Sequence, residues 1–567
     1  MVLPLRQDRE DMDMKNKHLR LRLVDDGCDV FAPREGKDWG YRYGPSIMQY
    51  GDGRIDAWFA SPGGCGVEAD WFTYRHSEDD GKTWTDEKVV TYPTPDSMDL
   101  FAVCDPAVIV IDGWYYLGYT STIFVDGGGV CNNAFVARSR TPDGPWYKWT
   151  GSGWGEERET IDDNGEPTTL HWQGRPAPII YYDEPWQYWG AGEPSFVRVG
   201  DTLYMYYTWT SKDADGNAFS QTRVATADLK AGDNWPATLT PRGIAIRRPD
   251  TGCDSCDVVY VDEAEKFLIL CTDRRFTVDS CLAVYESDDG LTFTRSCEVR
   301  TNVGEKCHNC GIAGGPDRHV SLKNPVAVAY AYGSQWGYWG TRFQKAVIEL
   351  TDEPDFSDAA SPAAPWPVQA WPMPTEPWPI HITTQPHYWV RKVSQGAFDV
   401  ALKWLDTAYI VRDCPADEVS VAAYDPTIVR FDGLTCTPLR PGYTYAVAHW
   451  RGRTVEFPVF VPEESVRDRD PKNRKLVSFT PQITEHTLYL AENELKQVRG
   501  CGVYDDGSWF EIYKPEDGVT LSGYDETLLA TGPEATFRAL AVGSTPLTVT
   551  CQGLSFTVQV NILPARD

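Results

Sequence analysis

The sequence predicts an all-β protein whose main part is a five-bladed β-propeller. One strand pattern recurs along it, and helical periodicity is almost absent. Each copy is a Pro-x-hydrophobic step, a short turn and an aromatic-rich strand, with clear copies starting at Gly44, Asp105 and Glu193. Weaker copies start at Asp257 and Asn324. Strand-like copies that recur at intervals of about 60 to 90 residues are typical of propeller blades.

A turn motif supports this prediction. Residues 77–84 match the Asp-box, Ser-x-Asp-x-Gly-x-Thr-Trp, at every fixed position. Residues 288–293 form an incomplete second copy in which Glu286 stands where the serine would fall. The Asp side chain caps its own turn and the Gly supplies a positive φ. The motif is therefore structural, and we exclude Asp79 and Asp288 as catalytic residues.

The chain is long enough for several domains, with 567 residues. We expect the propeller at 1–375, a β-sandwich at 376–470 and a second one at 471–567. Residues 362–380 carry too many prolines for a β-ladder and predict an extended linker. The alternating stretch 18–24 predicts a strand that closes the ring by completing the last blade. The final segment resembles bacterial Ig-like modules, and the segment before it resembles a degenerate copy.

Charge and targeting signals restrict the partners. The formal net charge is −29, which argues against binding to nucleic acid or to anionic membranes. No apolar run has transmembrane length, and the charged N-terminal stretch lacks a signal-peptide core. Because Ig-like modules are common on exported bacterial proteins, we expect an extracellular or cell-surface location.

The 15 cysteines are an odd number, so complete internal pairing is impossible. Cys253 and Cys256 form one close pair, and Cys307 and Cys310 form another. Two such pairs can build a zinc site, although the gap between them is long for one. Buried free thiols or a local disulfide are the alternatives.

Several stretches resemble glycoside hydrolase family 43 and the wider group of five-bladed propeller enzymes that act on sugars. They are residues 104–121, 136–146, 192–208 and 224–228. Family members use inward-facing carboxylates: a base that activates water, an acid that protonates the leaving oxygen, and a third group that tunes the acid. By matched position, the resemblance implies that Glu193 is the general acid and Asp105 the tuning aspartate.

One position departs from the family pattern. The resemblance places the catalytic base in the first blade, where this chain has Gly44, and glycine has no group that takes a proton. Glu68, Asp70 and Asp99 are the candidate substitutes. Asp257, at the fourth repeat, is a further catalytic candidate because equivalent positions in a radial fold converge on the axis.

The sequence also offers substrate-binding and metal-binding candidates. Tryptophan rings stack on the apolar faces of sugars, and polar side chains bind their hydroxyl groups. The substrate-binding candidates are Asp99, Trp71, Trp209, Trp336, His171 and His319. His308 is a candidate ligand for an axial divalent metal ion, the one cofactor considered.

The leading functional hypothesis is an exo-acting glycoside hydrolase that removes a terminal sugar from a glycan. A metal-dependent amino-sugar deacetylase is the second hypothesis, because a metal could replace the missing base. A non-catalytic glycan-binding propeller is the third, and Gly44 is the residue that favours it.

Overall fold

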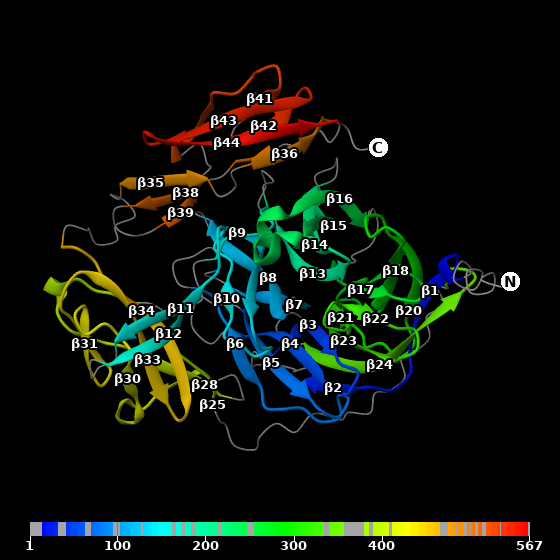
Figure 1. The fold of residues 1–567 in the computed structure, drawn as a ribbon, viewed down its shortest axis with the longest axis horizontal. Coiled ribbons are helices and arrows are strands. Elements are labelled where there is room, and N and C mark those ends of the chain that lie inside the picture. Colours follow the sequence, from blue (N-terminus) through cyan, green and yellow to red (C-terminus); the bar gives the residue numbers. More distant parts are fainter. Residues whose placement is uncertain are drawn as a thin grey trace, which may run out of the picture.

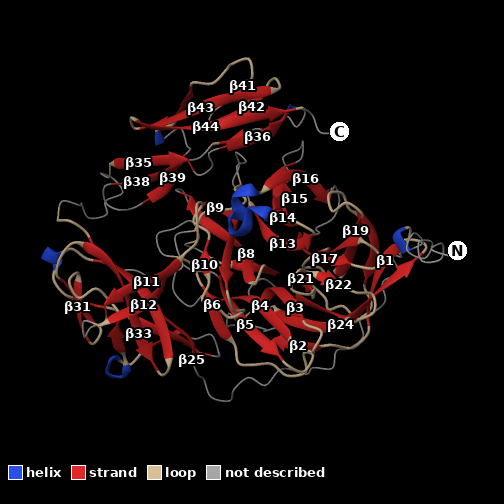
Figure 2. Cartoon of the chain, in the orientation of Figure 1, coloured by secondary structure: helices blue, strands red, loops and turns tan. Residues whose placement is uncertain are grey.

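The computed structural model describes residues 14–31, 41–62, 70–94, 99, 102–125, 129–161, 166–172, 176–182, 189–212, 218–246, 254–333, 339–355, 379–384, 389–406, 411–464, 475–481, 485–490, 496–498, 500–504, 509–512, 517–532 and 535–564. Strands account for nearly all regular structure in these residues (Figure 2). The structure has short 3₁₀ segments among its described residues: η1 (Leu229–Thr238), η2 (Val393–Gln395) and η3 (Ala416–Glu418). The expected all-β class is confirmed.

Five sheets form the larger part of the molecule (Figure 1). The first two contain β3 (Tyr43–Gln49), β4 (Ile55–Pro62), β5 (Asp70–Ser77) and β6 (Lys88–Thr91), then β7 (Cys104–Ile111), β8 (Trp114–Val125), β9 (Gly129–Ser139) and β10 (Tyr147–Lys148). The next two contain β13 (Ala191–Val199), β14 (Thr202–Lys212), β15 (Ala218–Asp228) and β16 (Thr240–Ile246), then β17 (Asp254–Val261), β18 (Lys266–Asp273), β19 (Cys281–Ser287) and β20 (Thr294–Val299), with β22 (His319–Val320) beside β17. The fifth contains β21 (His308–Ile312), β23 (Val326–Tyr332), β24 (Gly340–Thr351) and β1 (His18–Leu23), with β2 (Cys28–Phe31) also on β24.

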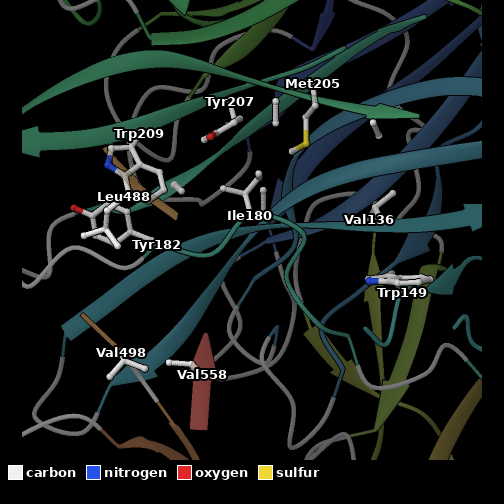
Figure 3. Close-up of a cluster of buried hydrophobic side chains, with 14 of the residues drawn as sticks. Val136, Trp149, Ile180, Tyr182, Met205, Tyr207, Trp209, Leu488, Val498 and Val558 are labelled. Carbon is white, nitrogen blue, oxygen red and sulfur yellow. The ribbon is translucent and has the colours of Figure 1, made fainter. Parts of the chain in front are cut away.

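The five sheets are arranged as a closed ring. Their first strands touch in the order β3, β7, β13, β17 and β21, and β21 touches β3 again. A separate hydrophobic cluster lies between each pair of neighbouring sheets. Figure 3 shows part of the cluster between the second and third sheets, where Val136, Met205 and Tyr207 pack. Burial of the aromatic and aliphatic faces of each sheet against both neighbours stabilises the ring.

The N-terminal strand completes the fifth sheet. β1 pairs antiparallel with β24, with His18 opposite Thr351 and Leu23 opposite Ala346. Leu19 and Leu21 alternate with polar residues and are 0% and 3% exposed. The closing strand predicted at 18–24 is therefore confirmed.

The first turn motif uses the residues that the sequence pattern predicts, and the second uses different ones. In the first, Asp79 accepts hydrogen bonds from the Thr83 amide at 2.8 Å and from the Ser77 hydroxyl at 2.9 Å. In the second, the equivalent residues are Ser287 and Asp289, which bond to each other at 2.9 Å. The prediction that Glu286 and Asp288 occupy the Ser and Asp positions of the motif was wrong. This copy has one residue fewer between its Asp and its Gly.

The last part of the chain forms two units with the same strand order. The first contains β25 (Pro379–Thr384), β26 (Trp389–Val390), β27 (Phe398–Asp399), β28 (Leu402–Asp406), β29 (Val411–Asp413), β30 (Ser420–Ala422), β31 (Val429–Asp432), β32 (Thr435–Pro438), β33 (Gly442–Trp450) and β34 (Arg453–Val461). The second contains β35 (Leu476–Pro481), β36 (Glu485–Tyr489), β37 (Lys496–Gln497), β38 (Gly500–Tyr504), β39 (Trp509–Ile512), β40 (Thr520–Ser522), β41 (Leu529–Thr531), β42 (Thr536–Ala539), β43 (Gly543–Cys551) and β44 (Leu554–Leu563). β25 contacts β6 of the ring, and β39 contacts β8.

Topology and turn chemistry identify these units as two copies of one module. In each, a parallel pair, β26 with β34 or β36 with β44, extends an antiparallel sheet. Asp425 accepts hydrogen bonds from the Thr427 amide and hydroxyl, and Asp525 does the same with Thr527. The linker predicted at 362–380 lies outside the described residues apart from its last two, which begin β25.

The structure bears on two more sequence predictions, the lack of a membrane-spanning segment and the state of the cysteines. Among the described helical segments, none combines the length and apolar character needed to cross a bilayer. Cys256, Cys307 and Cys310 are free thiols, so the local disulfide considered for the second close pair is absent. Cys253 lies outside the described residues.

A further hairpin stands between the second and third sheets in the sequence. It consists of β11 (Glu156–Ile161) and β12 (Pro167–Trp172), which pair antiparallel. β12 contains His171, whose side chain lies outside what the structure describes.

Candidate active site

Each first strand of the ring has an irregularity at its start. The pairing register shifts there, and one residue has a positive φ: Gly44 (59°), Asp105 (54°), Glu193 (50°), Ser255 (56°) and Asn309 (34°). We call these five residues the axial ring. A positive φ is uncommon for residues other than glycine, and strained backbone of this kind concentrates at functional sites.

The axial ring corrects two repeat starts. The fourth position is Ser255 and not Asp257, and the fifth is Asn309 and not Asn324, which lies in the turn before β23. Proline follows the ring residue in the first three strands, whereas Cys256 follows it in the fourth. A search for proline therefore misses the last two copies.

A pocket opens at the axial ring. It is lined by Gly44, Pro45, Asp105, Pro106, Glu193, Pro194, Ser255, Cys256, Asp257 and Cys310. Burial raises the pKa of the Cys256 and Cys310 thiols well above the usual value for cysteine. Both are therefore neutral near pH 7 and are poor nucleophiles, so the carboxylates are the reactive groups of this pocket.

Glu193 is held by hydrogen bonds from three directions. Its Oε2 accepts from the Thr208 hydroxyl at 2.6 Å and from the Ser255 amide at 3.0 Å. Its own amide donates to the Thr120 hydroxyl at 2.6 Å. The residue is only 4% exposed, so its carboxyl group has a fixed orientation beside the pocket.

Asn309 links Glu193 to Asp105. Its Nδ2 donates to Asp105 Oδ1 at 2.9 Å and lies 3.4 Å from Glu193 Oε1. A Cβ atom built on Gly44 would stand 3.3 Å from Asp105 Oδ1. Such a contact is tighter than an ordinary van der Waals contact, so Asp105 packs directly against the backbone of Gly44.

Asp70 is a buried carboxyl group of the first sheet. It starts β5 opposite Pro62, at the same end of the sheet as Gly44. Its Oδ1 accepts a hydrogen bond from the Tyr41 hydroxyl at 2.5 Å. Burial raises the pKa of Asp70 to about 7, against the lowering effect of the Tyr41 hydrogen bond, and the charge of Asp105 adds to the rise.

Asp257 lies below the axial ring in a buried ion pair. Its Oδ2 is 2.6 Å from Arg318 Nη2 and also accepts from the Ile312 amide at 2.8 Å. Its Oδ1 accepts from the Ser195 hydroxyl at 2.7 Å. The residue of this strand equivalent to Asp105 is Ser255, and Asp257 lies two residues further along with its carboxylate occupied by these donors.

Arg318 joins three of the first strands across the axis. It is 2% exposed and donates to the carbonyls of Ile47 on β3, Ile312 on β21 and Val258 on β17. The guanidinium group thus crosses the axis beneath the carboxylates. Sequence analysis did not single out Arg318.

The first-blade alternatives for the base have different environments. Asp99 is 0% exposed and forms an ion pair with Lys148 at 2.5 Å. It also accepts hydrogen bonds from the Thr94 amide and the Tyr119 hydroxyl, which is a structural arrangement. Glu68 lies outside the described residues.

The tryptophans proposed as sugar platforms are buried where the structure describes them. Trp71 is 0% exposed and Trp209 is 4% exposed. Trp209 packs between Tyr182, with ring centroids 4.8 Å apart, and the guanidinium of Arg223 at 4.3 Å. Trp336 lies outside the described residues.

The two histidines of the fifth and fourth sheets lie at opposite ends of the ring. His319 bonds Asp262 at 2.7 Å and borders a cavity of about 510 Å³ near Gln49, where β3 ends. His308 directly precedes Asn309, and its Nδ1 is 3.4 Å from Arg275 Nη1. A guanidinium group at this distance opposes the binding of a second cation at that nitrogen.

One group of potential metal ligands occurs among the described residues: Asp273, Cys281 and Glu298. It does not include His308 or the axial carboxylates. Arg295 contacts both acids, Asp273 at 2.8 Å and Glu298 at 2.5 Å. The guanidinium group already balances this acidic cluster, so its chemistry does not fit a divalent cation.

The most informative residues missed by sequence analysis are Ser255 and Asn309. In the sequence they are marked by a Ser-Cys and an Asn-Cys dipeptide, in the place where earlier copies have Asp-Pro or Glu-Pro. These dipeptides become recognisable only when the positive φ and the register shift are known.

Comparisons with known proteins found no matching family model and no matching curated protein. Among solved structures, a family 117 glycoside hydrolase of Zobellia galactanivorans is 14% identical over 59% of this chain and 91% of its own, with a TM-score of 0.40. A xylan β-1,4-xylosidase of Bacillus halodurans is 11% identical over 95% of this chain and 91% of its own, with a TM-score of 0.39. An α-L-arabinofuranosidase of Podospora anserina is 11% identical over 57% and 98%, with a TM-score of 0.34. At TM-scores this low, function has to be argued from this chain's own residues.

Proposed function

We propose that this protein is an exo-acting glycoside hydrolase whose five sheets are the blades of a β-propeller. One observation carries the proposal. Asp105 and Glu193 occupy equivalent positions on neighbouring strands, and Asn309 connects them beside a shared pocket. Glycosidic cleavage needs a protonated acid at the leaving oxygen and a base for the attacking water. A charged neighbour tunes the acid, and the proposal gives Glu193 the place of the acid and Asp105 that of the neighbour.

The pocket's lower boundary favours exo-action. The Asp257–Arg318 ion pair crosses the axis beneath the carboxylates and ties three strands together. A glycan that enters from the carboxylate end therefore does not pass through the ring. A terminal sugar held above this closed base is the proposed substrate.

The proposed roles follow from the environments. Glu193 donates a proton to the glycosidic oxygen as the bond from that oxygen to the anomeric carbon breaks. A water molecule forms the new bond to the anomeric carbon and gives its proton to a base. We assign this base to Asp70, which starts β5 at the same end of the first sheet as Gly44 and whose pKa of about 7 suits proton transfer at neutral pH. Asp105 tunes the pair through its contact with Asn309 and its charge effect on Asp70.

Gly44 favours one second candidate, a glycan-binding protein without turnover. The first position of the axial ring carries no carboxylate, so binding without cleavage is the outcome if Asp70 does not act as the base. No contact among the described residues favours the metal-dependent deacetylase. The C-terminal units are proposed to be Ig-like modules of an extracellular or cell-surface protein.

Mass spectrometry of an oligosaccharide panel tests the proposal. The wild type, with and without chelator, is compared with Glu193→Gln. Release of a terminal monosaccharide that chelator leaves unchanged, and that Glu193→Gln reduces by at least about 10²-fold, supports the hydrolase. Loss of an acetyl group that chelator prevents contradicts it in favour of the deacetylase. Tight binding with no mass change contradicts it in favour of a binding protein.

A further inference from the structure

Asn309 has a contact pattern that the proposed roles of Asp105 and Glu193 do not explain. Its Nδ2 lies 2.9 Å from Asp105 Oδ1 and 3.4 Å from Glu193 Oε1. The side-chain amide nitrogen carries two hydrogens, so one nitrogen serves both carboxylates. The residue is 0% exposed, and water does not compete for these contacts.

The orientation of the amide is fixed by its neighbours. The Asp105 carboxylate, when ionised, only accepts hydrogen bonds, so the nitrogen and not the oxygen of the amide faces it. Asn309 Oδ1 is buried and has no hydrogen-bond partner among the described residues. An unpaired buried carbonyl destabilises a folded protein, and stability alone therefore does not account for this side chain.

The backbone also does not require asparagine. Asn309 has a φ of 34°, and Gly44 occupies the equivalent position of the first sheet with a φ of 59°. Glycine reaches such φ values without strain and would leave no orphaned carbonyl. The contact with the two carboxylates is the feature that distinguishes asparagine from glycine here.

We propose that Asn309 is a positioning residue that holds the Asp105 and Glu193 carboxyl groups in one arrangement toward a shared glycosidic bond. This role rests on the hydrolase function proposed above. Glu193 becomes negatively charged beside Asp105 when it gives up its proton, and the N–H groups of Asn309 offset the resulting repulsion. The role requires a hydrogen-bond donor at this place, so shape alone does not fulfil it.

Two substitutions separate the donor from the shape. Asn309→Asp keeps the size of the side chain but replaces the NH₂ group with an oxygen, which donates only when the new carboxyl group is protonated. Asn309→Gly removes the amide and tolerates the positive φ. The charged groups around position 309 are Asp105 on β7 and Glu193 on β13, with Asp70 acting on Asp105 and His308 and Arg275 on the side of β21.

The experiment measures kcat and KM between pH 4.5 and 8.5 for the oligosaccharide that the wild type cleaves best in the panel. We expect Asn309→Gly to lower kcat by about 10²-fold, the effect of misplacing a reacting group by about 1 Å, with little change in KM. We expect Asn309→Asp to be equally impaired at pH 8.5 and to recover as the pH falls. Asn302→Asp, at a half-buried turn with a φ of 64°, is the matched control and keeps wild-type kinetics.

The outcomes separate this role from the function itself. If both variants at position 309 retain the wild-type kcat at every pH, the positioning role is wrong and the hydrolase stands. If Asn309→Asp is impaired equally at every pH and its thermal unfolding midpoint falls in parallel, the residue has a structural role only. A wild type that cleaves nothing in the panel overturns the hydrolase and this role together.

Discussion

The charge of Asp70 depends on surroundings that shift its pKa in opposite directions. Burial and the Asp105 charge disfavour its ionised form, whereas the Tyr41 hydroxyl favours it. The balance leaves a pKa of about 7, so the group changes charge within the physiological range. It does so in the sheet whose axial ring residue is glycine.

This pKa makes the stability of the folded protein depend on pH. An aspartate has a pKa of 3.8 in the unfolded chain, and that of Asp70 is about 7 in the fold, so the folded state binds more protons between these values. Stability is therefore fully present below pH 4 and falls as the pH rises to 7. The expected loss from this group is at most about 4 kcal/mol.

Asp70→Asn should remove that dependence. An amide stays neutral at every pH, so we expect the variant to gain stability relative to the wild type at pH 8 and to gain little at pH 4. Urea unfolding at the two pH values measures the difference, with Asp52→Asn, at an exposed turn, as the control. Equal effects of Asp70→Asn at both pH values would contradict the raised pKa. Turnover of the same variant tests its proposed role as the base.

At the scale of elements, the chain's first described strand completes its last sheet of the ring. β1 pairs with β24 along its whole length, and its leucines pack into the cluster between the fourth and fifth sheets. This strand from the other end of the ring covers the outer edge of β24 and becomes the outer strand of the sheet itself. It also couples the N-terminal segment to the stability of the entire ring.

Leu21→Ala tests this coupling. Leu21 is 3% exposed, and truncation of a buried leucine to alanine costs about 2–5 kcal/mol of unfolding free energy. Arg22→Ala is the control on the same strand, because Arg22 pairs with Glu349 at the surface. If the two variants unfold at the same urea concentration, β1 does not contribute to the core in solution.

The elements also show what a single sequence can predict here. The first three repeats and the closing strand were readable because Pro marks each bulge and because Leu alternates with Arg in the stretch 18–24. The last two bulges were not, since Cys256 and Cys310 replace proline. The contact between Asn309 and Asp105 spans 204 positions of the chain, and no local pattern reports a contact of that separation.

At the scale of the whole molecule, the axial carboxylates lie at one end of the ring, and the buried contacts of Arg318 link the first strands below them. The axial carboxylates lie where the first strands begin. Arg318 reaches the middle of those strands from a turn beyond their other end. Among the described residues, the two C-terminal units contact the ring at β6 and β8.

Arg318 and Asp257 should therefore act as one unit in stability. Arg318→Met leaves a buried carboxylate without its partner, which costs about 3–5 kcal/mol, whereas replacing both members of such a pair is much less costly. We expect the double variant Arg318→Met with Asp257→Asn to be more stable than Arg318→Met alone. Urea unfolding of both, with the surface-pair variant Arg198→Met as the control, measures the difference. A double variant that is less stable than Arg318→Met would show that the carbonyl contacts of Arg318, and not its pairing with Asp257, hold the strands together at the axis.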